Sequence, residues 1–385
     1  MKTLRIALLT SAPFPAREGI GTYVKNLAIE LQTAGHEPTV ITRGRADRGR
    51  RRTLDGLPVV ELPFFATYPI HVQVHGWFVA RYLARHAAEF DVINAHSPLV
   101  PIVGGELPLV TTLHSRLTTD GSATRVDDLR SLLIRLQTPV SARLERSLLR
   151  RSSAVAVVNG LIAAELGAEL GRSVPVVVRT NGVNPQRFQP APAVRRGDDV
   201  LAVGRLVHGK GFEDLLLAWQ TVAFNAPSAR LTIVGEGPLR SRLVALAGSL
   251  GVRATVRFVG ELSGTRSDEL IGLYQAARVV VQPSHHEGLS TVVLEAMACA
   301  AAVVATDVGA HSTVISEGCN GRLVAAREPA ALAAALSELL ANPSLARSFG
   351  TQARQTVVDR FSWPAIASAY VELFGSVQAV ARHAR

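Results

Sequence analysis

The sequence is poor in cysteine, in aromatic residues and in long hydrophobic runs, and each shortage argues against a class of protein. Cys299 and Cys319 are the only two cysteines among 385 residues, too few for a disulfide framework or a zinc site with four cysteine ligands. No run approaches the roughly 18 apolar residues of a membrane-spanning helix. The apolar run Ile6–Leu9 is too short for a signal peptide, so we interpret it as part of a first strand and expect a cytoplasmic protein.

Negative charge is also scarce in the first half of the chain. Residues 1–190 hold 23 Lys and Arg against 15 Asp and Glu, a net charge of +8, whereas residues 191–385 hold 18 against 16, a net charge of +2. Such an excess suits a nucleic acid, an anionic membrane face or a phosphorylated substrate. Aromatic residues make up only 5% of the chain, and it lacks zinc-finger spacing, a basic heptad region and an aromatic RNA-binding signature, which disfavours nucleic acid.

Short apolar runs alternate with helical periods along the chain, which is typical of parallel sheets with helices on both faces. The predicted fold is α/β, with two Rossmann-like, doubly wound domains that face each other across a cleft at the carboxyl ends of their strands. We place the first domain at residues 1–190, the second at 191–360 and a C-terminal helix at 361–385, with a linker at Asn184–Asp199. Strands are predicted at Leu4–Leu9, Thr39–Thr42, Val59–Leu62, Val92–Asn94, Leu109–Thr112, Val155–Val158, Val176–Arg179, Val200–Val203, Leu231–Val234, Thr255–Phe258, Val279–Gln282, Val303–Ala305 and Arg322–Val324.

The first glycine-rich loop, Glu18-Gly19-Ile20-Gly21, lies between a predicted strand and a predicted helix, where backbone amides favour a phosphate. It is not the dinucleotide fingerprint, because the spacing G-x-G-x-x-G is missing. The second strand ends at Thr42-Arg43, where an NAD site requires an acidic residue for the ribose. A dehydrogenase is therefore disfavoured.

A second glycine-rich loop, Gly204-Arg205-Leu206-Val207-His208-Gly209-Lys210-Gly211, follows a predicted strand directly. Arg205 offers a forked guanidinium and Lys210 a point charge, and together they suit a diphosphate. The alternative is a loop whose two cations are merely solvated.

The segment Pro283–Ala298 is the most specific in the chain. Glu287 lies in a loop after a strand, and Ser290 or Thr291 can cap a helix that contains Glu295. The amides after Gly288, at Leu289 and Ser290, can bind phosphate oxygens, and a carboxylate one turn into the helix can accept hydrogen bonds from ribose hydroxyls. The alternative is that Glu295 only forms an ion pair on a helix surface.

These segments together resemble the retaining nucleotide-sugar glycosyltransferases of family 4, which have the GT-B fold. The resemblance covers nearly the whole chain and depends on the order and spacing of many segments, with Glu287 and Glu295 eight positions apart. The matching segments are Gly19–Tyr23, Ala34–His36, Asp91–His96, Thr111–His114, Asn181–Asn184, Gly204–Gly211, Ile233–Pro238, Phe258–Gly260 and Glu287–Ala298.

The resemblance assigns a role to each candidate residue. Arg205 and Lys210 would hold the donor diphosphate, and Glu295 the ribose. Glu287 would bind sugar hydroxyls, His114 would lie near the anomeric centre, and Gly19 would let the backbone approach the phosphates. No cofactor is implied beyond a nucleoside diphosphate sugar as substrate. No metal is implied either, because such enzymes typically work without one and the chain has no Asp-x-Asp motif.

Three positions depart from the pattern of the family. Glu18 precedes Gly19 where two glycines are common, Ala300 and Ala302 stand where Gly and Pro often follow the helix, and Gly309-Ala310 replaces a glycine pair. None of them removes a proposed charge. We expect the alanines to change only how the helix ends.

The predicted reaction is retaining transfer of a hexosyl group from a UDP- or GDP-sugar to an acceptor hydroxyl. Same-face attack is favoured over double displacement through Glu287. A lone histidine at a strand end is usually structural, but the resemblance favours a functional His114, whereas His96, His285 and His286 are left open. A nucleotide-sugar 2-epimerase and a non-catalytic nucleotide-sugar or lipid-binding protein are the two alternatives.

The sequence says less about the acceptor, which is interpreted as a sugar, a small molecule or a lipid-linked glycan. Arg43–Arg52 carries six arginines against Asp47, and the apolar, histidine-bearing stretch Tyr68–Phe90 contains Trp77. This part of the chain could dock on the inner, anionic face of a membrane. The alternative is a solvated loop followed by an ordinary core helix.

Overall fold

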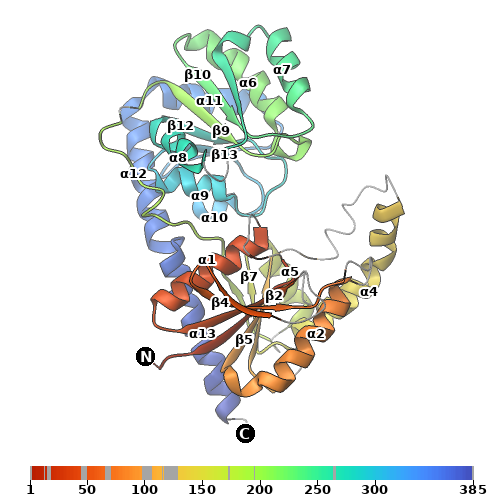
Figure 1. The fold of residues 1–385 in the computed structure, drawn as a ribbon. Helices are drawn as coiled ribbons and strands as arrows, with labels where there is room; N and C mark the ends of the chain where they lie inside the picture. Colours follow the sequence, from red (N-terminus) through yellow and green to blue (C-terminus); the bar gives the residue numbers. More distant parts are fainter. Residues whose placement is uncertain are drawn as a thin grey trace. The chain divides into compact units, whose positions relative to one another are not determined.

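The computed structural model describes residues 2–12, 14, 19–44, 50–65, 71–97, 106–114, 116, 129–171, 174–194, 196–262 and 266–383. The chain divides into two compact units (Figure 1). The first unit consists of Met1–Thr180 with Ile366–Arg385, and the second of Asn181–Ala365. The units therefore divide after residues 180 and 365, where the sequence led us to expect boundaries after residues 190 and 360.

The described part of the first unit forms one sheet with the strand order β3-β4-β2-β1-β5-β6-β7-β8. Every pair of neighbouring strands is parallel except β3 with β4. The strands are β1 (Arg5–Leu9), β2 (Glu37–Arg43), β3 (Arg50–Leu54), β4 (Leu57–Leu62), β5 (Val92–Ser97), β6 (Leu109–Leu113), β7 (Ala154–Val157) and β8 (Val176–Val178). The order reverses between β1 and β5, as in a doubly wound fold.

Helices of the first unit bury an apolar stripe on the sheet. In α1 the spacing of Tyr23, Leu27 and Leu31 puts these side chains on one buried face, and Gly35 at a φ of 83° follows the end of the helix. From Ile366 onward α13 belongs to the same unit, where the Tyr370 hydroxyl hydrogen-bonds Thr112 at 2.9 Å. The helices are α1 (Gly19–Thr33), α2 (His71–His86), η1 (Ala87–Glu89), α4 (Leu129–Arg151), α5 (Gly160–Leu170) and α13 (Trp363–His383).

The second unit is built on a fully parallel sheet with the strand order β11-β10-β9-β12-β13-β14. Its order reverses between β9 and β12. The strands are β9 (Asp199–Val203), β10 (Arg230–Val234), β11 (Val256–Gly260), β12 (Val279–Gln282), β13 (Ala302–Thr306) and β14 (Arg322–Val324). Each of these strands was predicted within two residues of its ends.

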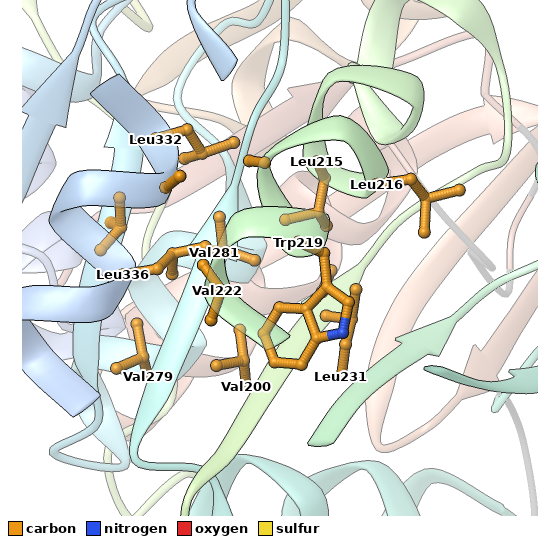
Figure 2. Packing of buried hydrophobic residues seen from close by; sticks show 14 of the residues in the cluster. Val200, Leu215, Leu216, Trp219, Val222, Leu231, Val279, Val281, Leu332 and Leu336 are labelled. Atoms are coloured by element: carbon orange, nitrogen blue, oxygen red, sulfur yellow. The ribbon is translucent and has the colours of Figure 1, made fainter. Parts of the chain in front are cut away.

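Alternate residues of these strands pack into two separate cores, one on each face of the sheet. Val279 and Val281 belong to one core and Val280 to the other. Figure 2 shows the first core, where Trp219 of α6 lies over the sheet and its indole nitrogen donates to Thr255 Oγ1 at 3.0 Å. The helices that surround the sheet are η2 (His208–Lys210), α6 (Phe212–Asn225), α7 (Arg240–Ser249), η3 (Arg253–Thr255), α8 (Ser267–Ala276), α9 (Thr291–Ala298), α10 (His311–Val314), α11 (Pro329–Ala341) and α12 (Pro343–Arg360).

The stretch Asn184–Asp199, expected as a linker, is part of the second unit and packs on it. Phe188 packs against one of the two cores, and the Arg196 guanidinium donates to the carbonyls of Ala277 and Cys299. The prolines and arginines of this stretch favoured its interpretation as a linker. In the structure, Arg196 instead donates hydrogen bonds to carbonyl groups at the ends of buried elements. Arg195 lies outside the described residues.

In the described part of the chain, no helix is both long enough and apolar enough to cross a membrane.

Candidate active site

The loops after β9 and β12 meet at the point where the strand order of the second unit reverses. In open α/β sheets, ligands bind beyond the carboxyl ends of the strands at such a point. The two loops are Gly204–Gly211 and Pro283–Ser290, and they carry seven of the candidate residues. The structure therefore brings these two predicted segments together.

Glycine lets the two loops approach closely. Gly211 has a φ of 67°, and a Cβ at this position would lie 1.9 Å from the Pro283 carbonyl oxygen. Gly209 accepts a backbone hydrogen bond from His285 at 2.9 Å. Gly204, at the start of the first loop, lies against the stem of Lys210, because a Cβ there would be 3.9 Å from Lys210 Cδ.

An ion pair joins the two loops. Lys210 Nζ donates to Glu287 Oε2, which also accepts from Ser284 Oγ at 3.2 Å and from Gln282 Nε2 at 3.4 Å. Both charged side chains are mostly buried, with 23% of Lys210 and 17% of Glu287 exposed. Two of the predicted site residues therefore form a charged pair in the ligand-free chain.

A second polar contact supports the same junction. His285 Nε2 lies 2.7 Å from Asp214 Oδ2, which is carried by the first turn of α6. His285 was left open by the sequence, and the structure gives it a partner that holds the loop after β12 against α6.

The loop after β13 also packs closely against this junction. Gly309 has a φ of 60°, and a Cβ there would lie 1.8 Å from the Glu287 carbonyl oxygen. Ala310 donates its N–H to the carbonyl of Gly288 at 3.1 Å. The family has a pair of glycines at these two positions. This chain has glycine at the first, where the positive φ and the close contact require it, and alanine at the second.

Helix α9 begins directly after the loop that carries Glu287. Ser290 is the N-cap residue, as predicted, but its side chain makes no capping hydrogen bond. The Leu294 N–H donates to the Ser290 carbonyl, and the amides that precede it in the first turn have no partner within the helix. Leu289 is buried, and its carbonyl accepts from Asn181 Nδ2 at 3.1 Å. Such a helix end favours an anion.

Glu295 lies inside α9 and does not form the surface ion pair considered above. Its Oε2 accepts a hydrogen bond from the Tyr274 hydroxyl at 2.8 Å. Burial raises the pKa of Glu295 to about 7, against the opposing effects of the Tyr274 hydrogen bond and the charge of Arg187. The carboxyl group is thus poised to change charge near neutral pH.

Arg205 is exposed and makes no ion pair or side-chain hydrogen bond within the described part of the chain. It extends from the same loop as Lys210. An exposed guanidinium of this kind is available for an anionic ligand.

The remaining two candidates, Gly19 and His114, belong to the first unit. Gly19, with a φ of 61°, is the first residue of α1, and Glu18 before it lies outside the described residues. His114 follows β6 directly, as predicted, and its Nε2 lies 3.0 Å from Nδ1 of His96 in β5. Burial lowers the pKa of His114 to about 3, so the imidazole is neutral.

Of the arginine-rich segment Arg43–Arg52, the described arginines lie in strands β2 and β3. Arg50–Leu54 forms the edge strand β3, and Arg51 and Arg52 are paired with Glu89 and Glu61. Residues 45–49, which include Arg45, Asp47 and Arg48, lie outside the described residues, as do residues 66–70 with Tyr68. Helix α2 buries Val79 and Leu83 in a core of the first unit and leaves Trp77 54% exposed.

Four polar residues of the junction were not found from the sequence: Asp214, Tyr274, Gln282 and Ser284. Tyr274 is part of an apolar helical period, and its hydroxyl meets Glu295 only in the folded chain. Gln282 and Ser284 flank Pro283 in the segment that was singled out, so their position was a signal that the sequence reasoning did not use. Among the described residues, no group of three or more His, Cys, Asp or Glu is placed to hold a metal ion.

Two parallel α/β sheets, the second with a charged junction at its reversal point, are the architecture of GT-B glycosyltransferases. Solved structures have the same fold across nearly the whole chain. Sucrose-phosphate synthase from Thermosynechococcus elongatus has a TM-score of 0.76 at 23% identity, and covers 98% of this chain and 100% of its own. HepE from Anabaena, solved in complex with UDP-glucose, has a TM-score of 0.70 at 20% identity and covers 97% and 100%.

Sequence comparisons lead to the family. The model for glycosyl transferases group 1 matches residues 185–356, and the model for Glycosyltransferase Family 4 matches residues 17–187. A glycogen synthase from Mycobacterium tuberculosis is 28% identical over 92% of this chain and 90% of its own length. Together the two models match residues 17–356 and both describe glycosyltransferases, so the chain is a glycosyltransferase whose second half matches the group 1 model.

Proposed function

We propose that the protein transfers a hexosyl group from a nucleoside diphosphate sugar to an acceptor hydroxyl, with retention of configuration and without a metal ion. The observation that carries the proposal is the Lys210–Glu287 pair, placed beside the N-terminus of α9 at the reversal point of the sheet. A protein of similar fold was solved with UDP-glucose. We assign residues of this chain to the diphosphate, the ribose and the sugar of such a donor.

The diphosphate would bind to Lys210, Arg205 and the free amides of the α9 N-terminus. The Lys210 ammonium is neutralised by Glu287. A phosphate would compete for Lys210, and Glu287 would then be free to accept hydrogen bonds from sugar hydroxyls. Because two cations and a helix end supply the positive charge, no metal ion is required, and we expect a chelator to leave the rate unchanged.

The ribose would hydrogen-bond to Glu295. A diol donates two hydrogen bonds, and an ionised carboxylate accepts both. Tyr274 occupies Oε2 of Glu295. The hydroxyl of Tyr274 therefore orients the carboxyl group for the ligand.

During transfer the bond between the anomeric carbon and the leaving phosphate oxygen breaks, and a bond to the acceptor oxygen forms on the same face. The acceptor proton passes to the departing phosphate. Negative charge grows on the diphosphate as the bond breaks, so cations already in place stabilise the transition state more than the ground state. Glu287 and Lys210 are paired in the ligand-free chain, which supports a binding role for Glu287 rather than a role as nucleophile.

The resemblance of the sequence to the family assigns His114 to the donor sugar. It also assigns Gly19 to the phosphates. The neutral imidazole of His114 is a hydrogen-bond donor at one nitrogen and an acceptor at the other, which suits a sugar hydroxyl.

For the acceptor side, we propose contact with an anionic membrane surface. Helix α4 carries Arg143, Arg146, Arg150 and Arg151 around an open recess of about 610 Å³, and all four side chains are exposed. Only Arg146 among them has an acidic partner within the described residues, Glu169. This face supports docking better than the predicted segment Arg43–Arg52, where Arg51 and Arg52 are neutralised.

The experiment supplies UDP-, GDP- and ADP-sugars together with sugar, polyol and phospholipid acceptors. We expect release of nucleoside diphosphate and a product that keeps the anomeric configuration of the donor, as read by NMR. An inverted product would contradict retention. Conversion of the donor without acceptor would identify an epimerase, and binding without nucleotide release would identify a non-catalytic protein.

The cations give a matched pair of variants. Arg205→Ala and Lys210→Ala should each lower kcat by about 100-fold or more while the melting temperature stays close to that of the parent. Arg257→Ala, which removes an exposed arginine of β11, should leave kcat unchanged. Near-normal turnover in both site variants would remove these residues from the mechanism.

A further inference from the structure

Two histidines of the first unit form an isolated hydrogen-bonded pair. His96 lies in β5 and His114 follows β6, and the two strands are parallel neighbours in which His96 is opposite Thr112. His96 Nδ1 and His114 Nε2 are 3.0 Å apart. The rings are stacked, with centroids 5.3 Å apart and planes at 25°.

His96 is buried completely, and its imidazole has one hydrogen-bond partner. Its relative exposure is 0%, and within the described residues its Nε2 atom has no partner. Burying a polar ring with half of its hydrogen-bonding capacity unused costs stability. A smaller apolar side chain would fill a core without that cost, so the contact with His114 is the evident reason for a histidine here.

Both imidazoles are neutral, which determines what their contact can be. Burial lowers the pKa of His114 to about 3 and the pKa of His96 well below its usual value. Two neutral rings share a hydrogen bond only if one nitrogen carries the proton and the other presents a lone pair.

The atoms of the contact couple the two tautomers. If His96 Nδ1–H donates to His114 Nε2, then His114 carries its own proton on Nδ1. If His114 Nε2–H donates instead, then His96 carries its proton on Nε2. In either direction both rings are protonated at the same ring position, so the tautomer of one ring determines that of the other.

Tyr23 holds the pair from a third element. Its ring from α1 meets the His114 ring edge-on at 4.8 Å and 82°. Its hydroxyl lies 3.3 Å from the carbonyl of Thr180 and 3.2 Å from the Tyr370 hydroxyl. The His114 ring is therefore fixed by packing on one side and by His96 at Nε2.

We propose that His96 is a positioning residue: it fixes the tautomer and ring orientation of His114 and thereby decides whether His114 Nδ1 meets a sugar hydroxyl as donor or as acceptor. The pairing itself depends only on the structure of the first unit. Its consequence for catalysis rests on the proposed function.

The direct test is the ¹⁵N spectrum of the whole protein with labelled histidine, without ligand. We expect His96 and His114 to show the same tautomer. His36 and His75 are internal references, because His36 Nδ1 accepts the Leu4 N–H and His75 Nδ1 donates to the Pro63 carbonyl. Opposite tautomers for His96 and His114, or rapid exchange of the His114 proton between its nitrogens, would overturn the proposal.

Substitution separates positioning from simple structural support. In His96→Phe, we expect His114 to change from one tautomer to a mixture of two. In His96→Asn, the side-chain amide lies where Nδ1 of His96 lies in the parent, and we expect His114 to return to one tautomer. His75→Phe removes another buried histidine of the same unit and should leave His114 unchanged. An unchanged His114 signal in folded His96→Phe would contradict the role of His96.

Measurement of kcat tests whether the pairing matters for the proposed reaction. We expect His96→Phe to lower kcat about tenfold or more and His96→Asn to recover most of it, with nucleoside diphosphate affinity unchanged in both. Paired tautomers with no transferase activity in the parent protein would refute the proposed function but not the pairing. Full kcat in folded His96→Phe from an active parent would refute the positioning role.

Discussion

At the scale of single residues, the candidate donor site is charged but internally paired. Lys210 is held by Glu287, and Glu295 by Tyr274, so both carboxyl groups have a partner before any ligand arrives. The order of the motifs was enough to place Lys210 and Glu287 at one site, because both follow parallel strands at the reversal point, but it did not predict that they form an ion pair. The contacts of Tyr274 and Asp214 could not be predicted, because they depend on how α8 and α6 are rotated against the sheet.

The pKa of Glu295 predicts how nucleotide binding depends on pH. Ribose hydroxyls donate to the ionised carboxylate, and burial raises the pKa of this group to about 7. Affinity for the preferred nucleoside diphosphate should therefore rise about tenfold between pH 6 and pH 8 as the carboxyl group ionises. Glu295→Gln should remove this rise, and calorimetric titration of both proteins measures it. An identical pH profile in the variant would contradict the assignment to the ribose.

The same group should affect stability in the opposite direction. Because the pKa of Glu295 is higher in the folded chain than its usual value, the folded state binds the proton more tightly. Its contribution is therefore fully present below about pH 4.5 and is lost as the pH rises through about 7. Urea unfolding at pH 5 and pH 8 should show a smaller loss of stability in Glu295→Gln than in the parent. An equal loss would place the carboxyl group in a more solvated environment.

At the scale of elements, a residue just after the end of α9 has a backbone conformation that strains alanine but not glycine. Ala300 has a φ of 57°, and the bonds Ala300 N–H to Met297 O and Ala301 N–H to Ala296 O form a Schellman motif, in which glycine is preferred. Of the two alanines expected to affect only helix termination, Ala300 lies just after the end of α9 and Ala302 is the first residue of β13.

Ala300→Gly should therefore stabilise the second unit by about 1 kcal/mol, because glycine adopts a positive φ without the Cβ penalty. Ala334→Gly is the matched control, since Ala334 is exposed within α11 and the same substitution there should cost about 0.5–1 kcal/mol. Chemical denaturation measures both. Destabilisation by both substitutions would show that Ala300 is not strained.

Helix α4 gives a prediction about membranes. Arg143, Arg150 and Arg151 have no acidic partner within the described residues, and each could contribute about 1 kcal/mol at an anionic surface. The parent protein should float with phosphatidylserine vesicles at low salt, and the triple glutamine variant should lose more than about 100-fold in binding.

The control for this prediction replaces three exposed arginines of the second unit, Arg253, Arg257 and Arg347, and so removes the same charge. It should bind vesicles nearly as well as the parent. Absence of binding by the parent, or equal loss in the control, would exclude docking through α4.

Strand β3 shows where reasoning about elements from sequence failed. Its sequence, Arg50-Arg51-Arg52-Thr53-Leu54, has neither the apolar run nor the alternation by which the other strands were predicted. It forms at the edge of the sheet, where charged side chains reach solvent and acidic neighbours, and where charge also protects against pairing with other chains. A turn through Asp55 and Gly56, both at positive φ, connects it to β4.

At the scale of the whole molecule, the alternation of strands and helices was sufficient to predict two parallel sheets. The boundary was harder to predict, because the residues after Thr180 resemble a linker in composition but pack on the second unit through Phe188 and Arg196. The composition of a segment indicates how well water would solvate it as a free chain. The contacts described here depend instead on carbonyl groups that come within reach of arginine only in the folded chain.

The central claim is that the junction of the loops after β9 and β12 binds a nucleoside diphosphate through Arg205 and Lys210. Calorimetric titration of the whole protein with UDP, GDP and ADP, repeated with Arg205→Ala and Lys210→Ala, tests it most directly. The account predicts that at least one of these nucleotides binds the parent and binds each variant at least about tenfold more weakly, a loss of about 1.4 kcal/mol or more. Binding of equal strength in parent and variants, or no binding of any of the three by the parent, would contradict it.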